Sequence, residues 1–408
     1  MNKIGFVIPW FAADIPGGAE SELRGLTQHL NQAGVNIEIL TTCVKEATAD
    51  WNIDYYPEGL EIIQNIPVRR FKVKKGDKDK FNCAMGNIYH KPDFTLQDED
   101  TFLNEVVNST ELYQYIKNYE KEYDLFVFIP YLFGTTYHGI LACPEKAVMI
   151  PCFHDEPFIH IKRFKEAFSM AQGMAFLSKP EMELVQELYC MDFMVAEVLG
   201  AGVETKFTGC SSDFAEKYSI KDPFILYAGR KDKGKNTDML IQYFEEYKKR
   251  NTTDLKLVLV GGGEVDIPDN MVSNIIDLGY ISEQDKYNAY SAALALCQPS
   301  RFESFSIVLM ESWLCKRPVL VFEPCKVTTH FAKEAMGGLY YNNYFEFEGC
   351  LNFFSNHPDI GDIMGENGRE FVMKNFDWDV MVLKYKDFFA RIINKRLERK
   401  KYNETDRN

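Results

Sequence analysis

The sequence predicts an α/β protein of two domains, each built around a doubly wound parallel sheet. The chain has 408 residues, which exceeds one ordinary hydrophobic core and suits two domains of roughly 150–200 residues. Short apolar runs alternate with longer amphipathic segments, the pattern of repeated strand–helix–strand units. This alternation restarts at Phe224, which indicates a second sheet.

The expected strands form two groups. In the first half of the chain they are Ile4–Trp10, Val35–Leu40, Leu125–Ile129, Ala147–Ile150 and Met174–Leu177. In the second half they are Phe224–Ala228, Lys256–Val260, Ile275–Leu278, Leu294–Gln298 and Val319–Phe322.

A glycine-containing joint at about 198–205 separates the two groups of strands. We therefore expect a first domain at 1–198, a second at 199–375, and a C-terminal amphipathic helix at 376–400. The segment 52–110 breaks the alternation and is rich in charged and aromatic residues, so it is expected to be an insertion in the first domain.

Composition and cysteine placement indicate a soluble cytoplasmic protein. Apolar residues make up 46% and charged residues 26%, as in globular domains. The first apolar run contains Pro9 and lacks a small-residue cleavage site. We therefore expect it to be a buried strand and not a secretory signal. No run reaches the roughly 18–20 apolar residues of a membrane-spanning helix. The ten cysteines stand singly, which predicts free thiols in a reducing compartment and no zinc site.

The charge distribution limits the partners. The formal net charge of -14 argues against a general nucleic-acid binder, because phosphate contacts need a basic face. Basic residues nevertheless cluster in the block Arg69–Lys75. This block is either a solvated loop or a surface attracted to anionic lipid headgroups or a diphosphate-linked lipid acceptor. Any membrane contact is expected to be peripheral, at the cytoplasmic face.

A glycine pair, Gly17-Gly18, lies between the first strand and a helix with Leu23, Leu26 and Leu30 on one face. Adjacent glycines let a loop approach a ligand, and a helix start offers N–H groups to an anion. The same residues also occur in ordinary turns. The loop lacks the G-x-G-x-x-G fingerprint, which counts against a simple dehydrogenase.

Two loops of the second half follow buried strands. Gly229-Arg230 and Lys235 come after the strand Phe224–Ala228, where open α/β sheets bind ligands, and two cations on one loop suit a diphosphate. The glycines 261–263 follow the next strand. They indicate either backbone close to a ligand or a flexible turn.

The most specific pattern is the segment 299–311, which holds Glu303 in a loop and Glu311 on the following helix. Eight steps at about 1.5 Å rise place the two carboxylates on the order of 10 Å apart, about the distance from a transferred sugar to the ribose of its nucleotide. Each carboxylate can accept a pair of hydroxyl hydrogen bonds.

With these motifs the chain resembles glycosyltransferase family four. That family shows two glutamates with seven residues between them, a glycine-Arg-x-x-x-x-Lys segment and a glycine pair on its first loop. The resemblance is strong over residues 200–330 and looser in the first domain. It implies the GT-B architecture, in which two Rossmann-like domains face each other across a cleft and the C-terminal helix at 376–400 crosses back to the first domain. One departure is Ser304, where the family often has glycine or another small residue, and it leaves the choice of sugar open.

The resemblance implies roles for the matching residues of the second domain. Arg230 and Lys235, after Gly229, would bind the donor diphosphate and stabilise the leaving group. Glu303 would contact hydroxyls of the donor sugar, and Glu311 would bind the ribose. The backbone around Ser304, Phe305 and Ser306 would hold sugar and phosphate. The remaining expected contacts of this domain are Gly262 in the glycine loop and, at the base, Tyr280 and Ile281.

In the first domain, Gly17 and Gly18 would let the first loop reach the phosphate. His154, after the run Ala147–Phe153, is similar to the family's histidine beside the donor sugar, although a lone histidine is more often structural.

The implied function is a retaining transfer of a sugar from a UDP- or GDP-linked donor to a glycan or lipid-linked acceptor, in bacterial surface-polysaccharide assembly. Fixed cations would replace a metal ion, so neither a metal nor a cofactor is expected. The alternatives are a sugar-nucleotide epimerase or phosphorylase of the same fold, and a non-catalytic subunit that binds sugar nucleotides.

Overall fold

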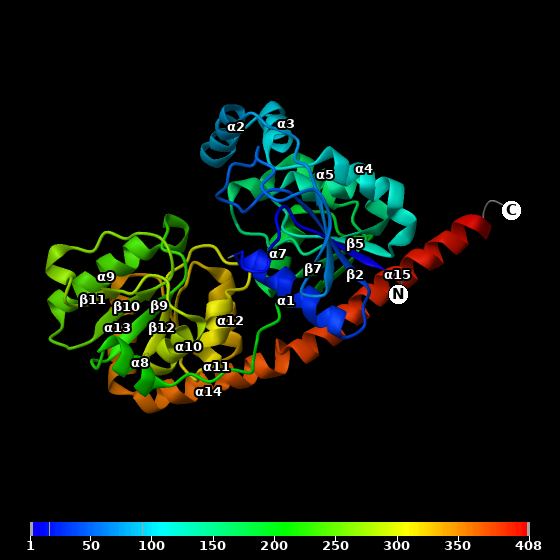
Figure 1. Cartoon of the computed structure of the whole chain (residues 1–408). Helices are drawn as coiled ribbons and strands as arrows, with labels where there is room; N and C mark the ends of the chain where they lie inside the picture. The colour runs from blue at the N-terminus through cyan, green and yellow to red at the C-terminus, as the bar shows by residue number, and fades with distance from the viewer. Residues whose placement is uncertain (1–2, 16, 92, 406–408) are drawn as a thin grey trace. The chain divides into compact units, whose positions relative to one another are not determined.

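The computed structural model describes residues 3–15, 17–91 and 93–405, with side chains to residue 399. The chain divides into two compact units (Figure 1). Unit 1 comprises Met1–Gly202 and Trp378–Asn408, and unit 2 comprises Val203–Asp377. Each unit contains a mainly parallel sheet with helices, which confirms the predicted two-sheet α/β architecture.

Unit 1 holds an eight-stranded sheet in the order β3-β4-β2-β1-β5-β6-β7-β8. The strands are β1 (Ile4–Val7), β2 (Ile37–Thr42), β3 (Gly59–Ile63), β4 (Ile66–Phe71), β5 (Leu125–Phe128), β6 (Ala147–Met149), β7 (Gly173–Phe176) and β8 (Val195–Val198). Neighbouring strands are parallel, except that β3 runs antiparallel to β4.

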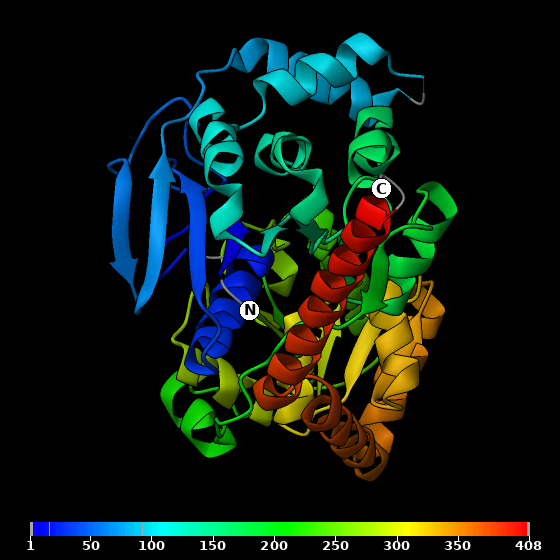
Figure 2. The ribbon, with the colours of Figure 1, turned by 90° about the vertical axis from the view of Figure 1, so that its right-hand side faces the viewer.

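The segment 52–110 contains two strands that the sequence pattern missed. β4 pairs with β2 and β3 pairs with β4 at the edge of the sheet, visible as light-blue arrows at the left of Figure 2. The residues of β3 are almost all exposed, so the strand lacks the apolar signal of a buried strand. Two residues of the basic block also lie in β4, where Arg69 donates to Glu38 and Arg70 to Glu61.

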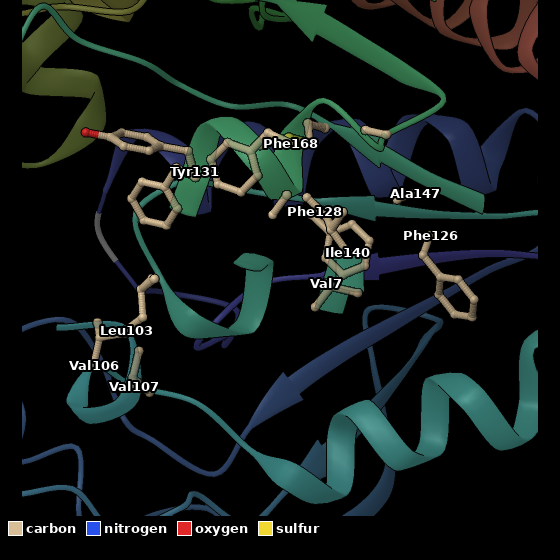
Figure 3. Packing of buried hydrophobic residues seen from close by; sticks show 14 of the residues in the cluster. Val7, Leu103, Val106, Val107, Phe126, Phe128, Tyr131, Ile140, Ala147 and Phe168 are labelled. Atoms are coloured by element: carbon tan, nitrogen blue, oxygen red, sulfur yellow. The ribbon is translucent and has the colours of Figure 1, made fainter. Parts of the chain in front are cut away.

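The helices of unit 1 surround an aromatic-rich core. They are α1 (Gly18–Gln32), α2 (Lys78–His90), α3 (Leu96–Glu105), α4 (Thr110–Tyr119), α5 (Gly134–Ala142), α6 (Lys162–Phe168), α7 (Lys179–Leu188) and α15 (Trp378–Thr405), with short 3-10 turns η1 (Glu120–Glu122), η2 (Pro144–Lys146) and η3 (Pro157–His160). Figure 3 shows Phe128 of β5 against Ile140 of α5 and Val7 of β1. All three are fully buried.

The last helix, α15, completes this core. Its Phe389 contacts Phe6 of β1, with ring centroids 6.4 Å apart. At the start of α15, the Trp378 ring packs so closely on Gly202 that a Cβ there would lie 2.1 Å from it. The C-terminal segment is therefore part of unit 1, although the whole of unit 2, Val203–Asp377, separates it in sequence from the rest of that unit.

Unit 2 holds a six-stranded sheet, all parallel, in the order β11-β10-β9-β12-β13-β14. The strands are β9 (Phe224–Ala228), β10 (Lys256–Val260), β11 (Ile275–Asp277), β12 (Ala295–Gln298), β13 (Val319–Phe322) and β14 (Gly338–Tyr341). The helices are α8 (Ser211–Tyr218), α9 (Thr237–Arg250), α10 (Glu283–Ala292), α11 (Ile307–Leu314), α12 (Lys326–Glu334), α13 (Tyr344–Asn356) and α14 (Pro358–Asn375), with 3-10 turns η4 (Lys233–Lys235) and η5 (Asp269–Met271).

The edge strands β8 and β14 were also absent from the sequence prediction. Their residues are mostly half-buried, so neither forms the continuous apolar run that marks the central strands.

Candidate donor-binding site

The basic loop leaves the central strand of unit 2. β9 is fully buried, and Gly229 follows it with φ 145°, a conformation that L side chains rarely adopt. The Arg230 side chain is 74% exposed, and its Nε lies 3.5 Å from Asp232 Oδ2. Asp232 Oδ1 accepts from the backbone N–H of Lys235 at 3.0 Å. Asp232 therefore holds together the loop that carries both predicted cations.

Lys235 and Glu303 meet although 68 positions separate them. The Lys235 ammonium donates to Glu303 Oε1 at 2.7 Å, and Gln298 Nε2 donates to the same oxygen at 3.3 Å. The Glu303 side chain is 9% exposed and that of Lys235 is 22% exposed. The structure thus brings together two of the predicted residues at the carboxyl ends of β9 and β12.

The N-terminus of α11 adjoins this pair in the chain. Ser306 is the N-cap residue, with φ 73°, and its side chain makes no capping hydrogen bond. The first N–H groups of a helix have no partner within the helix and can bind an anion. Phe305 is buried and packs edge-on against Phe331 and Phe376, so its side chain anchors the loop. Ser304 beside it is half-buried.

Three buried side-chain oxygens of the segment 298–306 have no hydrogen-bond partner among the residues that the structure describes. They are Gln298 Oε1, Ser300 Oγ and Ser306 Oγ. Buried polar groups without partners are costly and uncommon in folded proteins. Together with the N–H groups of α11, they form a set of groups suited to the oxygens of a sugar or phosphate.

Glu311 lies on α11 with its side chain 9% exposed. Lys286 Nζ donates to Glu311 Oε1 at 2.6 Å, and Tyr290 OH donates to Oε2 at 2.9 Å. Glu311 and Glu303 therefore have separate basic partners, Lys286 and Lys235. Neither Lys286 nor Tyr290 was predicted as a site residue. Their spacing of four residues on one helix was the available signal, because such residues lie on the same face.

The glycine loop contacts both the basic loop and the expected base-binding segment. Gly261 and Gly263 have φ 119° and 96°. A Cβ on Gly262 would lie 2.5 Å from the Tyr280 ring, so the ring would have to move to admit a larger residue. Tyr280 itself is 76% exposed, and Ile281 after it is half-buried.

A buried ion pair that the sequence pattern missed fastens these loops to one another. The Lys231 side chain is 1% exposed, and its ammonium donates to both carboxylate oxygens of Asp277, at 2.6 and 2.7 Å. Asp277 also accepts from the Gly279 N–H at 2.9 Å, and the Lys231 N–H donates to the Gly262 carbonyl at 2.7 Å. A charged loop gives no sequence signal for which of its cations is buried.

The remaining predicted residues belong to unit 1. Gly17 is the N-cap of α1 with φ 145°, and Gly18 is its first residue. A Cβ on Gly17 would lie 2.0 Å from a carboxylate oxygen of Glu20, which in turn accepts from Trp10 Nε1. The start of α1 is therefore lined by a carboxylate as well as by backbone N–H groups.

His154 is partly exposed, and its Nδ1 lies 3.5 Å from Glu156 Oε1. The same Glu156 oxygen accepts from Tyr131 OH at 2.6 Å. Burial alone would raise the pKa of Glu156, but the hydrogen bonds from His154 and Tyr131 outweigh it and lower that pKa. Glu156 thus stays a carboxylate that orients the His154 ring.

Among the described residues, no group of three or more His, Cys, Asp or Glu side chains is arranged to hold a metal ion. No helix among them is long and apolar enough to cross a membrane. All ten cysteines are free thiols.

Residues 212–371, which contain the Arg230 and Lys235 loop and both glutamates, match the family model described as glycosyl transferases group 1. The segment is a group 1 glycosyltransferase domain. The predicted resemblance to a glycosyltransferase family is confirmed as a match to group 1. The group 1 domain occupies most of unit 2.

Two curated relatives are similar over part of their length. The chain is 33% identical over 150 residues to the N-acetylgalactosamine-N,N'-diacetylbacillosaminyl-diphospho-undecaprenol 4-alpha-N-acetylgalactosaminyltransferase of Campylobacter jejuni, an alignment that covers 35% of this chain and 39% of the relative. It is 23% identical over 185 residues to the O-antigen chain mannosyltransferase C of Escherichia coli, covering 43% and 48%. The matched regions thus span less than half of either relative.

A solved structure matches nearly the whole chain. The sucrose-phosphate synthase of Thermosynechococcus elongatus has a TM-score of 0.73 at 17% identity, with 97% of this chain and 100% of that one covered. The group 1 domain therefore belongs to a chain with the two-domain α/β fold of GT-B glycosyltransferases.

Proposed function

We propose that this chain is a retaining glycosyltransferase that moves a hexose from a nucleoside-diphosphate sugar to a glycan or lipid-linked acceptor. The observation that carries the proposal is the Lys235–Glu303 pair of 2.7 Å, formed beside the uncapped start of α11. An ammonium, a carboxylate and free N–H groups close to one another suit the diphosphate and the hydroxyls of such a donor.

The proposed chemistry is mainly electrostatic. As the bond from the sugar to the diphosphate breaks, negative charge grows on the leaving phosphate. Lys235 and the N–H groups of α11 stabilise this charge. The exposed Arg230 guanidinium, on the same loop, adds a second cation to the diphosphate.

Glu303 accepts from hydroxyls of the donor sugar, and Glu311 accepts from the ribose. The acceptor hydroxyl attacks the face from which the diphosphate departs, and the leaving phosphate takes up its proton. No metal ion is needed in this scheme.

The relatives support the proposed acceptor class. The name of the Campylobacter jejuni relative describes transfer onto a diphospho-undecaprenol-linked sugar, and that of the Escherichia coli relative describes the O-antigen chain. We therefore propose a role in bacterial surface-polysaccharide assembly, at the cytoplasmic face of the membrane. Arg69 and Arg70 of β4 are bound to Glu38 and Glu61. We therefore propose that Lys74 and Lys75, which are exposed, contact the anionic headgroups.

The first experiment screens UDP- and GDP-hexoses for stabilisation of the protein in thermal unfolding, because a donor that binds the folded state raises its stability. The stabilising donor is then incubated with glycan and lipid-diphosphate acceptors in the presence of a chelator. The expected result is nucleoside-diphosphate release and a product that keeps the anomeric configuration of the donor, measured by NMR.

The alternatives give different results. An epimerase would change the sugar without an acceptor and without releasing the nucleoside diphosphate, and a phosphorylase would require inorganic phosphate. A non-catalytic subunit would bind the donor without turnover. Inversion of the anomeric configuration would contradict the proposed mechanism.

The variant Lys235→Met tests the role of the ammonium. We expect kcat to fall by about 10²-fold, the effect of removing one charge-stabilising group. Lys233→Met is the matched control, since Lys233 lies in the same turn η4 but is exposed, and it should keep kcat within about twofold. Equal turnover of the Lys235 variant and the wild type would remove Lys235 from the mechanism.

A further inference from the structure

The carboxylate of Glu311 is held by one helix, α10. Lys286 donates to one of its oxygens at 2.6 Å and Tyr290 to the other at 2.9 Å. The two donors are four residues apart on α10, hence one turn apart on the same face. Because each oxygen receives its own donor from a rigid helix, both the position and the rotation of the carboxylate plane are defined.

The two donors leave part of the carboxylate free. An ionised carboxylate has about four lone-pair sites on its two oxygens. Lys286 and Tyr290 occupy one site on each oxygen, so one site on each oxygen remains. Two neighbouring hydroxyl groups, as in the 2′ and 3′ positions of a ribose, match this pair of sites.

Both side chains act as donors at neutral pH. Tyr290 is fully buried, and burial, together with the carboxylate of Glu311, raises the pKa of Tyr290 well above its usual value. Its hydroxyl group therefore keeps its proton. Lys286 carries a positive charge on a side chain that is 28% exposed.

The helix that carries the donors is itself anchored. Asp285, the residue before Lys286, accepts from Lys217 at 2.6 Å and from Tyr218 OH at 3.2 Å, both on α8. Ser282 caps the start of α10 by accepting from the Asp285 N–H at 3.1 Å. These contacts fix α10 without involving Glu311.

We propose that Lys286 and Tyr290 are positioning residues that orient Glu311 and thereby give the site its preference for ribose over 2′-deoxyribose nucleotides. The proposal rests on the proposed function, in which Glu311 binds the ribose. Lys286 and Tyr290 act through that carboxylate and not by contact with the ribose.

The test measures the dissociation constants of UDP and 2′-deoxy-UDP, and of GDP and 2′-deoxy-GDP, by calorimetry with the full chain. The wild type should bind the preferred ribonucleotide about tenfold more tightly than its deoxy form, the scale of one hydrogen bond to a charged group. In Lys286→Met and in Tyr290→Phe this ratio should fall to about two or less. Glu311→Gln should lose it as well.

Lys217→Met is the matched control. It removes an ammonium that donates to Asp285 of α10 at 2.6 Å, the distance of the Lys286–Glu311 bond. Lys217 is not a partner of Glu311. Because Tyr218 and Ser282 still hold Asp285 in this variant, α10 keeps its place and the ratio should equal that of the wild type. Thermal unfolding of each variant establishes that it is folded, and Lys286→Met, at a partly exposed position, carries the test if Tyr290→Phe does not fold.

Two failures are distinguishable. If the wild type shows no ribose preference, the role of Glu311 in the proposed function is wrong and the positioning role falls with it. If the wild type and Lys217→Met show the preference, Glu311→Gln loses it, and Lys286→Met and Tyr290→Phe keep it, the ribose role stands and the positioning role is overturned. Equal weakening of both nucleotides with an unchanged ratio overturns it too, because that is the effect of general structural damage.

Discussion

Charged side chains of this protein are buried in two different ways. In unit 2, Lys231 is buried as a cation, and two hydrogen bonds to Asp277 offset its loss of hydration. In unit 1, Glu22 and Glu181 are buried, and neither forms an ion pair with a described residue. Burial raises the pKa of each to about 8. At neutral pH both are therefore held mainly in the protonated, uncharged form.

The raised pKa of Glu22 predicts a pH dependence of stability. In the unfolded chain Glu22 loses its proton near pH 4.5, whereas in the folded protein it does so near pH 8. Between these values the folded state binds more protons, so the free energy of unfolding falls as pH rises, by about 1.4 kcal/mol per pH unit for this group. Glu22→Gln removes this contribution. The difference in free energy of unfolding between the variant and the wild type should therefore be several kcal/mol more favourable to the variant at pH 8 than at pH 5.

Urea unfolding of wild type and variant between pH 5 and pH 8 measures this effect. Glu181 contributes a slope of the same sign in both proteins, so the variant should lose the Glu22 share of the slope and keep the Glu181 share. Glu183→Gln, at an exposed position of α7, is the control and should leave the slope unchanged. Identical slopes for wild type and Glu22→Gln would contradict the assignment.

At the scale of elements, the position of α11 depends on close packing against glycines. The Trp313 side chain of α11 is fully buried, and its Nε1 donates to the Gly337 carbonyl at 2.8 Å. A Cβ on Gly368 of α14 would lie 2.2 Å from the Trp313 ring. Since α11 carries Glu311 and begins close to Glu303 in the chain, the contact between Trp313 and Gly368 fixes the distance between α11 and α14 and thereby the position of Glu311.

Gly368→Ala should therefore displace Trp313 and destabilise the protein by about 1–3 kcal/mol, the usual cost of overpacking a core. Gly349→Ala is the control in a neighbouring helix, α13, because nothing lies within 4 Å of its added Cβ. That change should stabilise by about 0.5–1 kcal/mol, as alanine does in a helix interior. Chemical denaturation compares the two, and effects of the same sign would refute this account of the packing.

At the scale of the whole molecule, the chain passes from unit 1 to unit 2 and back. The return places α15 in the core of unit 1, where Tyr385, Phe388, Phe389 and Ile392 are buried. A Cβ on Gly173 of β7 would lie 2.3 Å from Ile392, which shows how closely the helix packs on the sheet. The folding of unit 1 therefore depends on the C-terminal segment Trp378–Asn408, which follows unit 2 in the chain.

Deletion of residues 378–408 tests this dependence. Unit 1 would lose a helix that packs on Phe6 of β1 and on Gly173 of β7, so we expect hydrogen exchange protection in its strands to collapse. Unit 2, whose sheet and helices are complete within 203–377, should keep its protection. Unchanged protection of β1 in the truncated protein would show that α15 is dispensable.

The central strands and the site motifs were predictable from the sequence, and the reason is local. Strands buried on both faces, such as β9 and β10, appear as continuous apolar runs, and the loops that follow them lie at one edge of a parallel sheet. This placed Arg230, Lys235 and Glu303 on neighbouring loops. The exposed edge strand β3 lacks such a run because only its pairing with β4 makes it a strand.

The pairing of side chains was decided only by the tertiary structure. The sequence by itself determined two α/β sheets, the loops that carry the candidate residues and a group 1 glycosyltransferase pattern. It could not determine that Lys231 is buried on Asp277, that Lys286 and Tyr290 hold Glu311, or which side chains of α15 enter the core of unit 1. These contacts join residues far apart in the chain, and they depend on side-chain directions that are set when helices and strands pack together.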